Sequence, residues 1–142
     1  MQLEQFLFCE MARAELSGQL SLIGLHPGDQ IAIQLPASTP LQLPNLSCVV
    51  ILGDMERVRT LRVQCQIRYL ETEVLNAPEQ VQPRPAPLKF HTLMFGFSPF
   101  LCLQGPGDYE FRITVQPEEE SPTTYSRKFR IERHNPPEQT RH

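Results

Sequence analysis

A strict alternation of side chains at residues 61–69 constrains the fold most. In LRVQCQIRY every second residue is apolar or aromatic, and the residues between are arginine or glutamine. Successive side chains of a β-strand point to opposite faces, so this pattern predicts a strand with one buried face. The same period returns at 109–115 and 125–131, where only Arg127 interrupts the apolar side. We interpret Arg127 as lying near a sheet edge.

Shorter apolar runs predict further strands. They lie at residues 5–10, 19–25, 30–36, 45–53, 90–97 and 100–103. In the run at 45–53, Val49 and Ile51 are apolar on the reverse face, which predicts that this strand is covered on both sides. Residues 11–16 could form one helical turn.

The chain has 14 prolines against 7 glycines, and proline breaks helix interiors but is tolerated at strand ends. Eight or nine short strands without a helical stripe indicate an all-β fold. We predict an antiparallel two-sheet sandwich, immunoglobulin-like or C2-like.

The 142 residues suit one domain, which we place at residues 1–132. Four prolines between 77 and 88 predict an extended, mobile loop with polyproline character. Residues 133–142 have no apolar side to pack and are predicted to be disordered.

The stretch GPGDYEF at 105–111 predicts scaffold rather than a working site. Tyr109 follows a glycine-containing turn at the start of a late strand. Immunoglobulin-type sandwiches place a tyrosine corner there, in which the phenol bonds a nearby backbone group.

Two stretches also carry a resemblance, FLFCEMARAELSGQLSLIGL at 6–25 and GPGDYEFRITV at 105–115. Together they resemble a family of small uncharacterised bacterial proteins in which a first strand ending in Cys leads to an LIG strand and a GxYxF strand follows later. The resemblance implies a cytoplasmic bacterial β-sandwich without a known activity. The proline-rich loop at 77–88 does not match that pattern.

Charge and hydropathy argue against several classes of binding partner and against a membrane location. The formal net charge of −3 argues against binding to nucleic acid or to an anionic membrane. The longest apolar window, 93–103, contains Pro99 and is too short to cross a bilayer. The run at 6–9 lacks the basic flank of a signal peptide, so we expect a cytoplasmic protein.

No cofactor or metal is expected. The four cysteines are far apart in sequence and form no CxxC pair, so we interpret them as small buried hydrophobic residues; the alternative is one reactive thiol. We interpret the run Glu118 to Glu120 as a charged segment that keeps the protein soluble and prevents strand edges from aggregating. The alternative is a Ca²⁺ site.

Five basic residues are the candidate partner site. They are Arg62, Arg68, Arg112, Lys128 and Arg130, which alternation places on one solvent-facing side. Arginine forks pair with carboxylates, so this face could bind an acidic protein partner. Alternatively, these residues pair with Glu110 and Glu132 and have no function.

The apolar piece at 95–103 has two interpretations. Its five large side chains, Phe95, Phe97, Phe100, Leu101 and Leu103, either complete the core or leave an edge strand that pairs with another copy to form a homodimer.

We therefore expect a non-catalytic protein-interaction module that binds through a sheet face or an edge strand. The first alternative is a ligand-binding sandwich that holds a carbohydrate or small anion in its end loops. The second is an enzyme whose site is assembled from distant residues.

Overall fold

The computed structural model describes residues 1–17, 19–35 and 39–134. Within these ranges it contains twelve strands and no helix, which confirms the all-β prediction. The strands are β1 (Gln2–Ala14), β2 (Leu20–His26), β3 (Gln30–Gln34), β4 (Gln42–Leu43), β5 (Leu46–Gly53), β6 (Thr60–Tyr69), β7 (Thr72–Asn76), β8 (Gln80–Pro83), β9 (His91–Phe97), β10 (Phe100–Leu101), β11 (Gly107–Pro117) and β12 (Thr123–His134).

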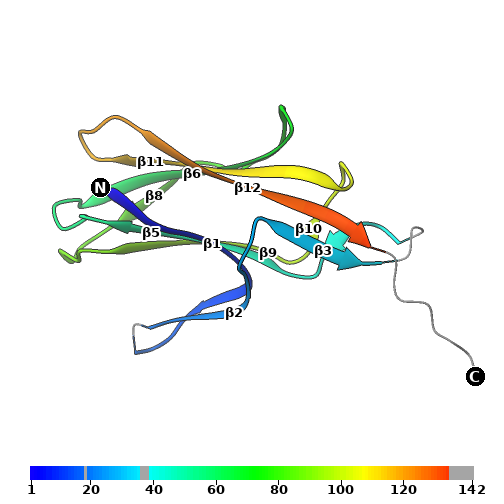
Figure 1. Cartoon of the computed structure of the whole chain (residues 1–142). Helices are drawn as coiled ribbons and strands as arrows, with labels where there is room; N and C mark the ends of the chain where they lie inside the picture. The colour runs from blue at the N-terminus through cyan, green and yellow to red at the C-terminus, as the bar shows by residue number, and fades with distance from the viewer. Residues whose placement is uncertain (18, 36–38, 135–142) are drawn as a thin grey trace, which may run out of the picture.

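Two sheets lie one over the other (Figure 1). Sheet A has the order β2-β1-β5-β9, and sheet B has the order β3-β12-β11-β6-β7, with β8 also pairing with β6. Of these pairings, only that of β3 with β12 is parallel. Strands β4 and β10 form a small separate pair. The arrangement is the predicted two-sheet sandwich.

The alternation seen in the sequence decides which side chains meet between the sheets. The apolar sides of β6, β11 and β12 are buried together, and their members are Leu61, Val63, Cys65, Ile67, Tyr109, Phe111, Ile113, Val115, Phe129 and Ile131. From sheet A, the ring of Phe8 lies 5.2 Å from that of Phe111 and 4.9 Å from that of Phe129, centroid to centroid. The two sheets therefore share one core.

Arg127 lies near a sheet edge, as predicted. The part of β12 that carries it pairs with β11, whereas β3 joins β12 only from Arg130 onward. The guanidinium turns inward, lies 5.1 Å from the ring centroid of Phe8 and donates a hydrogen bond to the carbonyl of Phe6. Arg127 of sheet B thus contacts β1 of sheet A and links the two sheets near the edge of sheet B.

Three local predictions are wrong. Residues 11–14 continue β1 instead of forming a helical turn, because they pair with β2. The proline-rich segment 77–88 includes β8, which pairs with β6. Arg133 and His134, which were predicted to be disordered, belong to β12; residues 135–142 lie outside the described residues.

The proline-rich segment is anchored by Arg84, a charged side chain that is only 5 % exposed. Its guanidinium donates to the carbonyls of Met55, Val58 and Leu88, the last two at 2.7 and 2.8 Å. These bonds fasten the segment to the loop between β5 and β6. The segment is therefore built into the end of the sandwich.

The tyrosine corner is present. The hydroxyl of Tyr109 donates to the carbonyl of Gly105 at 2.7 Å, and its ring stacks on Phe129 at 5.7 Å between centroids. Residues 105–111 therefore close the turn into β11, in agreement with the interpretation as scaffold.

Candidate interaction surfaces

The outer face of sheet A carries an apolar patch, with Gln5, Ser47 and Thr92 on the same side of the sheet. Strand register places Leu7 beside Val49 and Cys9 beside Leu25, and the neighbours of these residues along each strand, such as Phe8 and Val50, point into the core. The apolar face, as we call it, consists of Leu7, Cys9, Met11, Ile23, Leu25, Val49, Ile51 and Met94. Antiparallel sandwiches normally expose a polar face on this side.

Burial on the apolar face is uneven. Cys9 and Val49 have no exposed surface, although they lie outside the shared core. Met11, Ile23, Leu25 and Met94 around them are each 44–49 % exposed. Large apolar side chains that are half exposed on one face of a sheet are of the kind that marks interaction sites.

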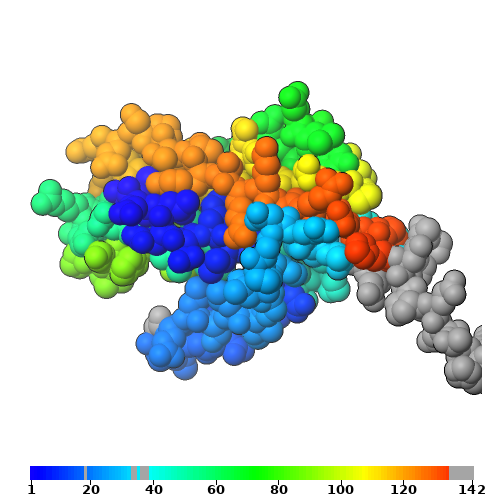
Figure 2. Space-filling view, in the orientation of Figure 1, coloured from blue at the N-terminus to red at the C-terminus, as the bar shows by residue number. Residues whose placement is uncertain are grey.

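The second half of β1 and its partner β2 extend this face as an arm. The arm projects from the body of the molecule, as the blue segment below the sandwich in Figures 1 and 2 shows. On this face it pairs Met11 with Ile23 and then Arg13 with Ser21, whereas Ala14 and Leu20 pair on the reverse face, and Leu16 near its tip is fully exposed. A two-stranded hairpin is marginally stable in water by itself, so an apolar arm gains most from being covered.

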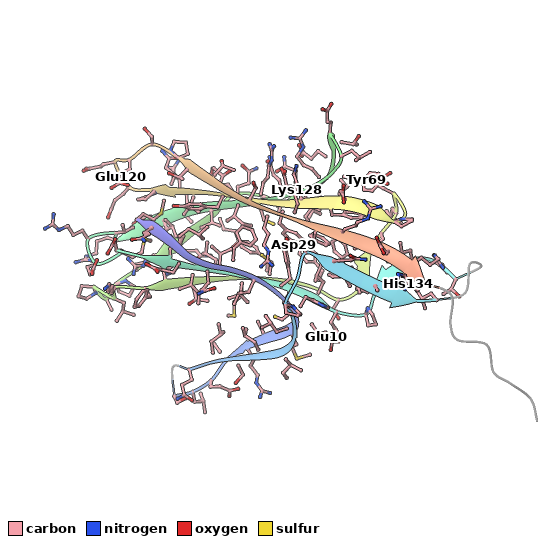
Figure 3. The ribbon with its side chains drawn as sticks, viewed as in Figure 1. Glu10, Asp29, Tyr69, Glu120, Lys128 and His134 are labelled. Carbon is pink, nitrogen blue, oxygen red and sulfur yellow. The ribbon has the colours of Figure 1, made fainter. Side chains whose placement is uncertain are left out.

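The outer face of sheet B carries all five predicted site residues. The side chain of Lys128 points away from sheet A in Figure 3, and the two-residue period places the other four on the same side. The prediction that these residues share a solvent face is therefore correct.

Four of these residues have polar partners. The ion pairs are Arg62 with Glu79 at 3.9 Å, Arg112 with Glu110, and Arg130 with Asp108 at 3.3 Å and Glu132 at 2.9 Å. Arg68 donates to the carbonyl of Glu71 at 2.8 Å. Exposed pairs of this type contribute little to stability. Charges of both signs alternate over this face.

The structure brings three of the five together. Arg68, Arg112 and Lys128 line a cleft of about 450 Å³ beside the turn between β6 and β7, with Glu110 at its centre. Arg62 lies beside Glu118 and Glu119 in another hollow, and Arg130 lies in a third with Glu132. The five residues therefore do not form one continuous site.

The apolar piece at 95–103 divides between core and surface. Phe100 is buried, and Phe95 and Phe97 pack against the core, but Leu101 and Leu103 are 51 % and 84 % exposed. The two leucines, with Val74 and Leu75 of β7, line an apolar cleft of about 250 Å³ at the end of the sandwich.

The cysteines are free and buried. Burial raises the pKa of Cys65 to about 12 and that of Cys102 to about 11, and it raises the pKa of Cys9 and of Cys48 as well. Thiols in such surroundings behave as small hydrophobic groups, which supports our interpretation.

The Glu118 to Glu120 run has a structural contact. The carboxylate of Glu118 accepts a hydrogen bond from the backbone N–H of Arg59 at 2.6 Å. In residues 1–17, 19–35 and 39–134, no group of three or more His, Cys, Asp and Glu side chains could hold a metal ion. Nor does a helix long and apolar enough to cross a membrane occur there.

The apolar face was missed in the sequence, although one signal of it was present. Val49 and Ile51 were recognised as apolar on the reverse side of their strand, and we expected another layer to cover them. Val49 has no exposed surface, in agreement with that expectation, whereas Ile51 is only partly buried. The signal could have been extended to Cys9, Leu7 and Leu25 only with the strand order, which the sequence does not give.

Comparison with known proteins identifies no family. No protein-family model matches the sequence, and no curated protein matches it. Among solved structures, the soluble domain of PmoD from a Methylocystis species is similar over 92 % of this chain and 96 % of that chain, with 14 % sequence identity and a TM-score of 0.40.

Proposed function

We propose that this protein is a non-catalytic interaction module that binds another protein through the apolar face of sheet A and its projecting arm. One observation carries the proposal. The apolar side chains of Met11, Ile23, Leu25 and Met94 are about half exposed on the face of sheet A on which Cys9 and Val49 are fully buried. A partner with an apolar surface would remove this ring from water, which stabilises a complex by roughly 25 cal/mol per Å² of apolar area before the costs of association.

The apolar face is a stronger candidate than the arginine face for a physical reason. Surface ion pairs on sheet B already satisfy Arg62, Arg112 and Arg130, so a partner must displace those pairs before it gains new ones. The half-exposed apolar side chains of Met11, Ile23, Leu25 and Met94 form no ion pairs, so a partner would displace water from them. A second copy of this chain is the alternative occupant, as an edge-strand or face-to-face homodimer.

Affinity capture with two matched variants tests the proposal. Ile23→Glu adds a charge to the apolar face, and Ser126→Glu adds the same charge to the exposed face of sheet B. We expect Ile23→Glu to lose the captured partner and Ser126→Glu to keep it, with both variants folded by circular dichroism. If Ile23→Glu retained the partner and Ser126→Glu lost it, the binding site would lie on sheet B instead of sheet A.

A second candidate function is the binding of a small apolar ligand in the cleft beside Leu101 and Leu103. Its aliphatic and aromatic lining favours a hydrocarbon group over the carbohydrate or anion expected from the sequence. A thermal-shift titration with short fatty acids tests it, because a ligand at a hundred times its dissociation constant adds about 2.7 kcal/mol of stability. Unchanged melting would rule out those ligands.

The cytoplasm of a bacterium remains our proposed location. Four buried free thiols are typical of proteins from reducing compartments, which supports it. Fractionation of cells that produce the chain tests this location, and recovery outside the cytoplasmic fraction would contradict it.

A further inference from the structure

We propose a second binding site, for an acidic peptide segment, in the cleft beside the turn between β6 and β7. The peptide would place a carboxylate among Arg68, Arg112 and Lys128 and a neighbouring apolar side chain against Leu70. This site lies on sheet B, opposite the apolar face, so it is independent of the function proposed above. A module with both sites could join two partners.

The charges around the cleft favour an anion at its centre. Strand register places Glu110 directly between Arg68 on β6 and Lys128 on β12, and Arg112 donates to the Glu110 carboxylate. Glu110 thus carries one negative charge among three positive ones, and its side chain is only 15 % exposed. A ligand carboxylate would meet the positive charge that Glu110 leaves unbalanced.

Two further acidic residues, Glu71 and Asp108, also line the cleft, and an excess of one positive charge is left once Asp108 is counted with its partner Arg130. Asp108 is paired with Arg130 at 3.3 Å, and Glu71, which is exposed at the rim, offers its backbone carbonyl to Arg68. No hydrogen bond or ion pair within the described ranges engages the ammonium of Lys128, whose three donors are therefore available to a ligand.

Leu70 supplies the second, independent observation. It sits at the turn with φ of +54° and is 69 % exposed, and its side chain lines the cleft. The left-handed conformation is unfavourable for leucine, and glycine or asparagine would relieve the strain. The two-residue turn between Tyr69 and Thr72 requires a positive φ but not a leucine, and burial does not explain a leucine here either. Contact with a ligand does, because strained residues persist at binding sites.

The segment that carries Leu70 stands above sheet B. In Figures 1 and 2 the green segment around β7 rises from the outer surface of that sheet. Leu70 and Glu71 can therefore form one wall of the cleft, and Lys128 forms the opposite one.

Titration of the ¹⁵N-labelled protein with two matched peptides tests the proposal. One is an acetylated, amidated hexapeptide of alternating Glu and Leu, and the other has Gln in place of Glu. We expect shifts of the amides of Leu70, Glu110 and Lys128, with the Glu peptide binding up to about fivefold more tightly, as one favourable charge contact predicts. Salt at 0.5 M should remove most of that difference.

Variants separate binding from folding. Lys128→Glu should weaken binding of the Glu peptide by about fivefold or more. Arg57→Glu, at an exposed residue of another loop, should leave that binding unchanged. Leu70→Gly should weaken the binding of both peptides. It should also raise the melting temperature of the protein by about 2–4 °C, because glycine relieves the backbone strain. Glu119→Gly, which relieves a φ of +61° at the hairpin between β11 and β12, should raise melting without affecting binding.

Four results would overturn the proposal. The first is an absence of shifts around the cleft, and the second is equal affinity for the Glu and Gln peptides. The third is wild-type affinity in Leu70→Gly. Binding of inorganic phosphate as tightly as the peptide would also overturn it, and would indicate a small-anion site instead.

Discussion

Nε of Arg84 lies 3.2 Å from Nδ1 of His91 and donates a hydrogen bond to it. A ring nitrogen that accepts a hydrogen bond carries no proton, so His91 is neutral, and its Nε2–H donates to the side-chain oxygen of Gln82 at 2.9 Å. The pair joins the proline-rich segment to the first residue of β9. Its geometry makes the end of the sandwich sensitive both to mutation and to pH.

Replacing Arg84 should destabilise the fold strongly. Arg84→Met fills similar space but leaves the carbonyls of Val58 and Leu88 without a donor, whereas the carbonyl of Met55 keeps the N–H of Val58 at 3.1 Å. Buried acceptors left unpaired cost about 1–3 kcal/mol each, so we expect a total loss of roughly 3 kcal/mol in urea unfolding. Arg57→Met, at an exposed residue, should change stability by less than about 0.5 kcal/mol. Similar losses in both variants would contradict the anchoring role.

Stability should fall as the pH is lowered below about 6.5. Burial and the charge of Arg84 lower the pKa of His91 below its ordinary value of 6.5, and burial lowers that of His26. The folded state therefore binds fewer protons than the unfolded state, and each histidine reduces the unfolding free energy by at most about 1.4 kcal/mol per pH unit from 6.5 down to its lowered pKa.

Unfolding of His91→Gln at pH 7 and pH 5 provides the check. Glutamine can still accept from Arg84 but does not titrate, so the variant should lose less stability on acidification than the wild-type protein. Equal losses in the two proteins would show that His91 does not contribute to the pH dependence.

The hydroxyl of Tyr109 in the tyrosine corner should contribute more to the free energy of unfolding than the more exposed hydroxyl of Tyr69. Tyr109→Phe removes the donor to the Gly105 carbonyl, and we expect a loss of about 1–2 kcal/mol in chemical unfolding. Tyr69→Phe is the matched control, since the Tyr69 hydroxyl bonds the carbonyl of Pro106 at 2.9 Å in contact with water. Its loss should be smaller; a reversed order would argue against the corner as scaffold.

The native cysteines should resist alkylation. A thiol with a pKa of about 11 is ionised about one part in a thousand at pH 8, and burial slows its reaction further. Iodoacetamide followed by mass spectrometry should label none of the four until urea unfolds the chain. Ser126→Cys, on the exposed face of sheet B, should be labelled rapidly. Labelling of one native cysteine at that rate would support the reactive-thiol alternative.

The layered fold was predictable from the sequence because its central strands are half buried. Period-two alternation identified β6, β11 and β12 and the side chains that they bury. The short strands β7 and β8 were missed because each forms by pairing with β6, and proline composition gives no information about that pairing. Residues 11–14 were mistaken for a helical turn for the same reason.

The site was less predictable than the fold. Alternation placed the five basic residues on one face correctly, but whether they are paired depends on cross-strand register, which sets Glu110 beside Arg68 and Lys128. The apolar face depends on strands β1, β2, β5 and β9 lying side by side in sheet A. Short apolar runs indicate strands but do not tell which of their two faces stays in contact with water.

Site-specific photo-crosslinking in living cells tests the central claim most directly. A benzophenone amino acid at position 23, on the apolar face, should give covalent adducts with a second protein or a second copy of the chain. The same group at position 126, on the exposed face of sheet B, should give few or none. Adducts from position 126 together with none from position 23 would contradict the assignment of the binding surface to sheet A.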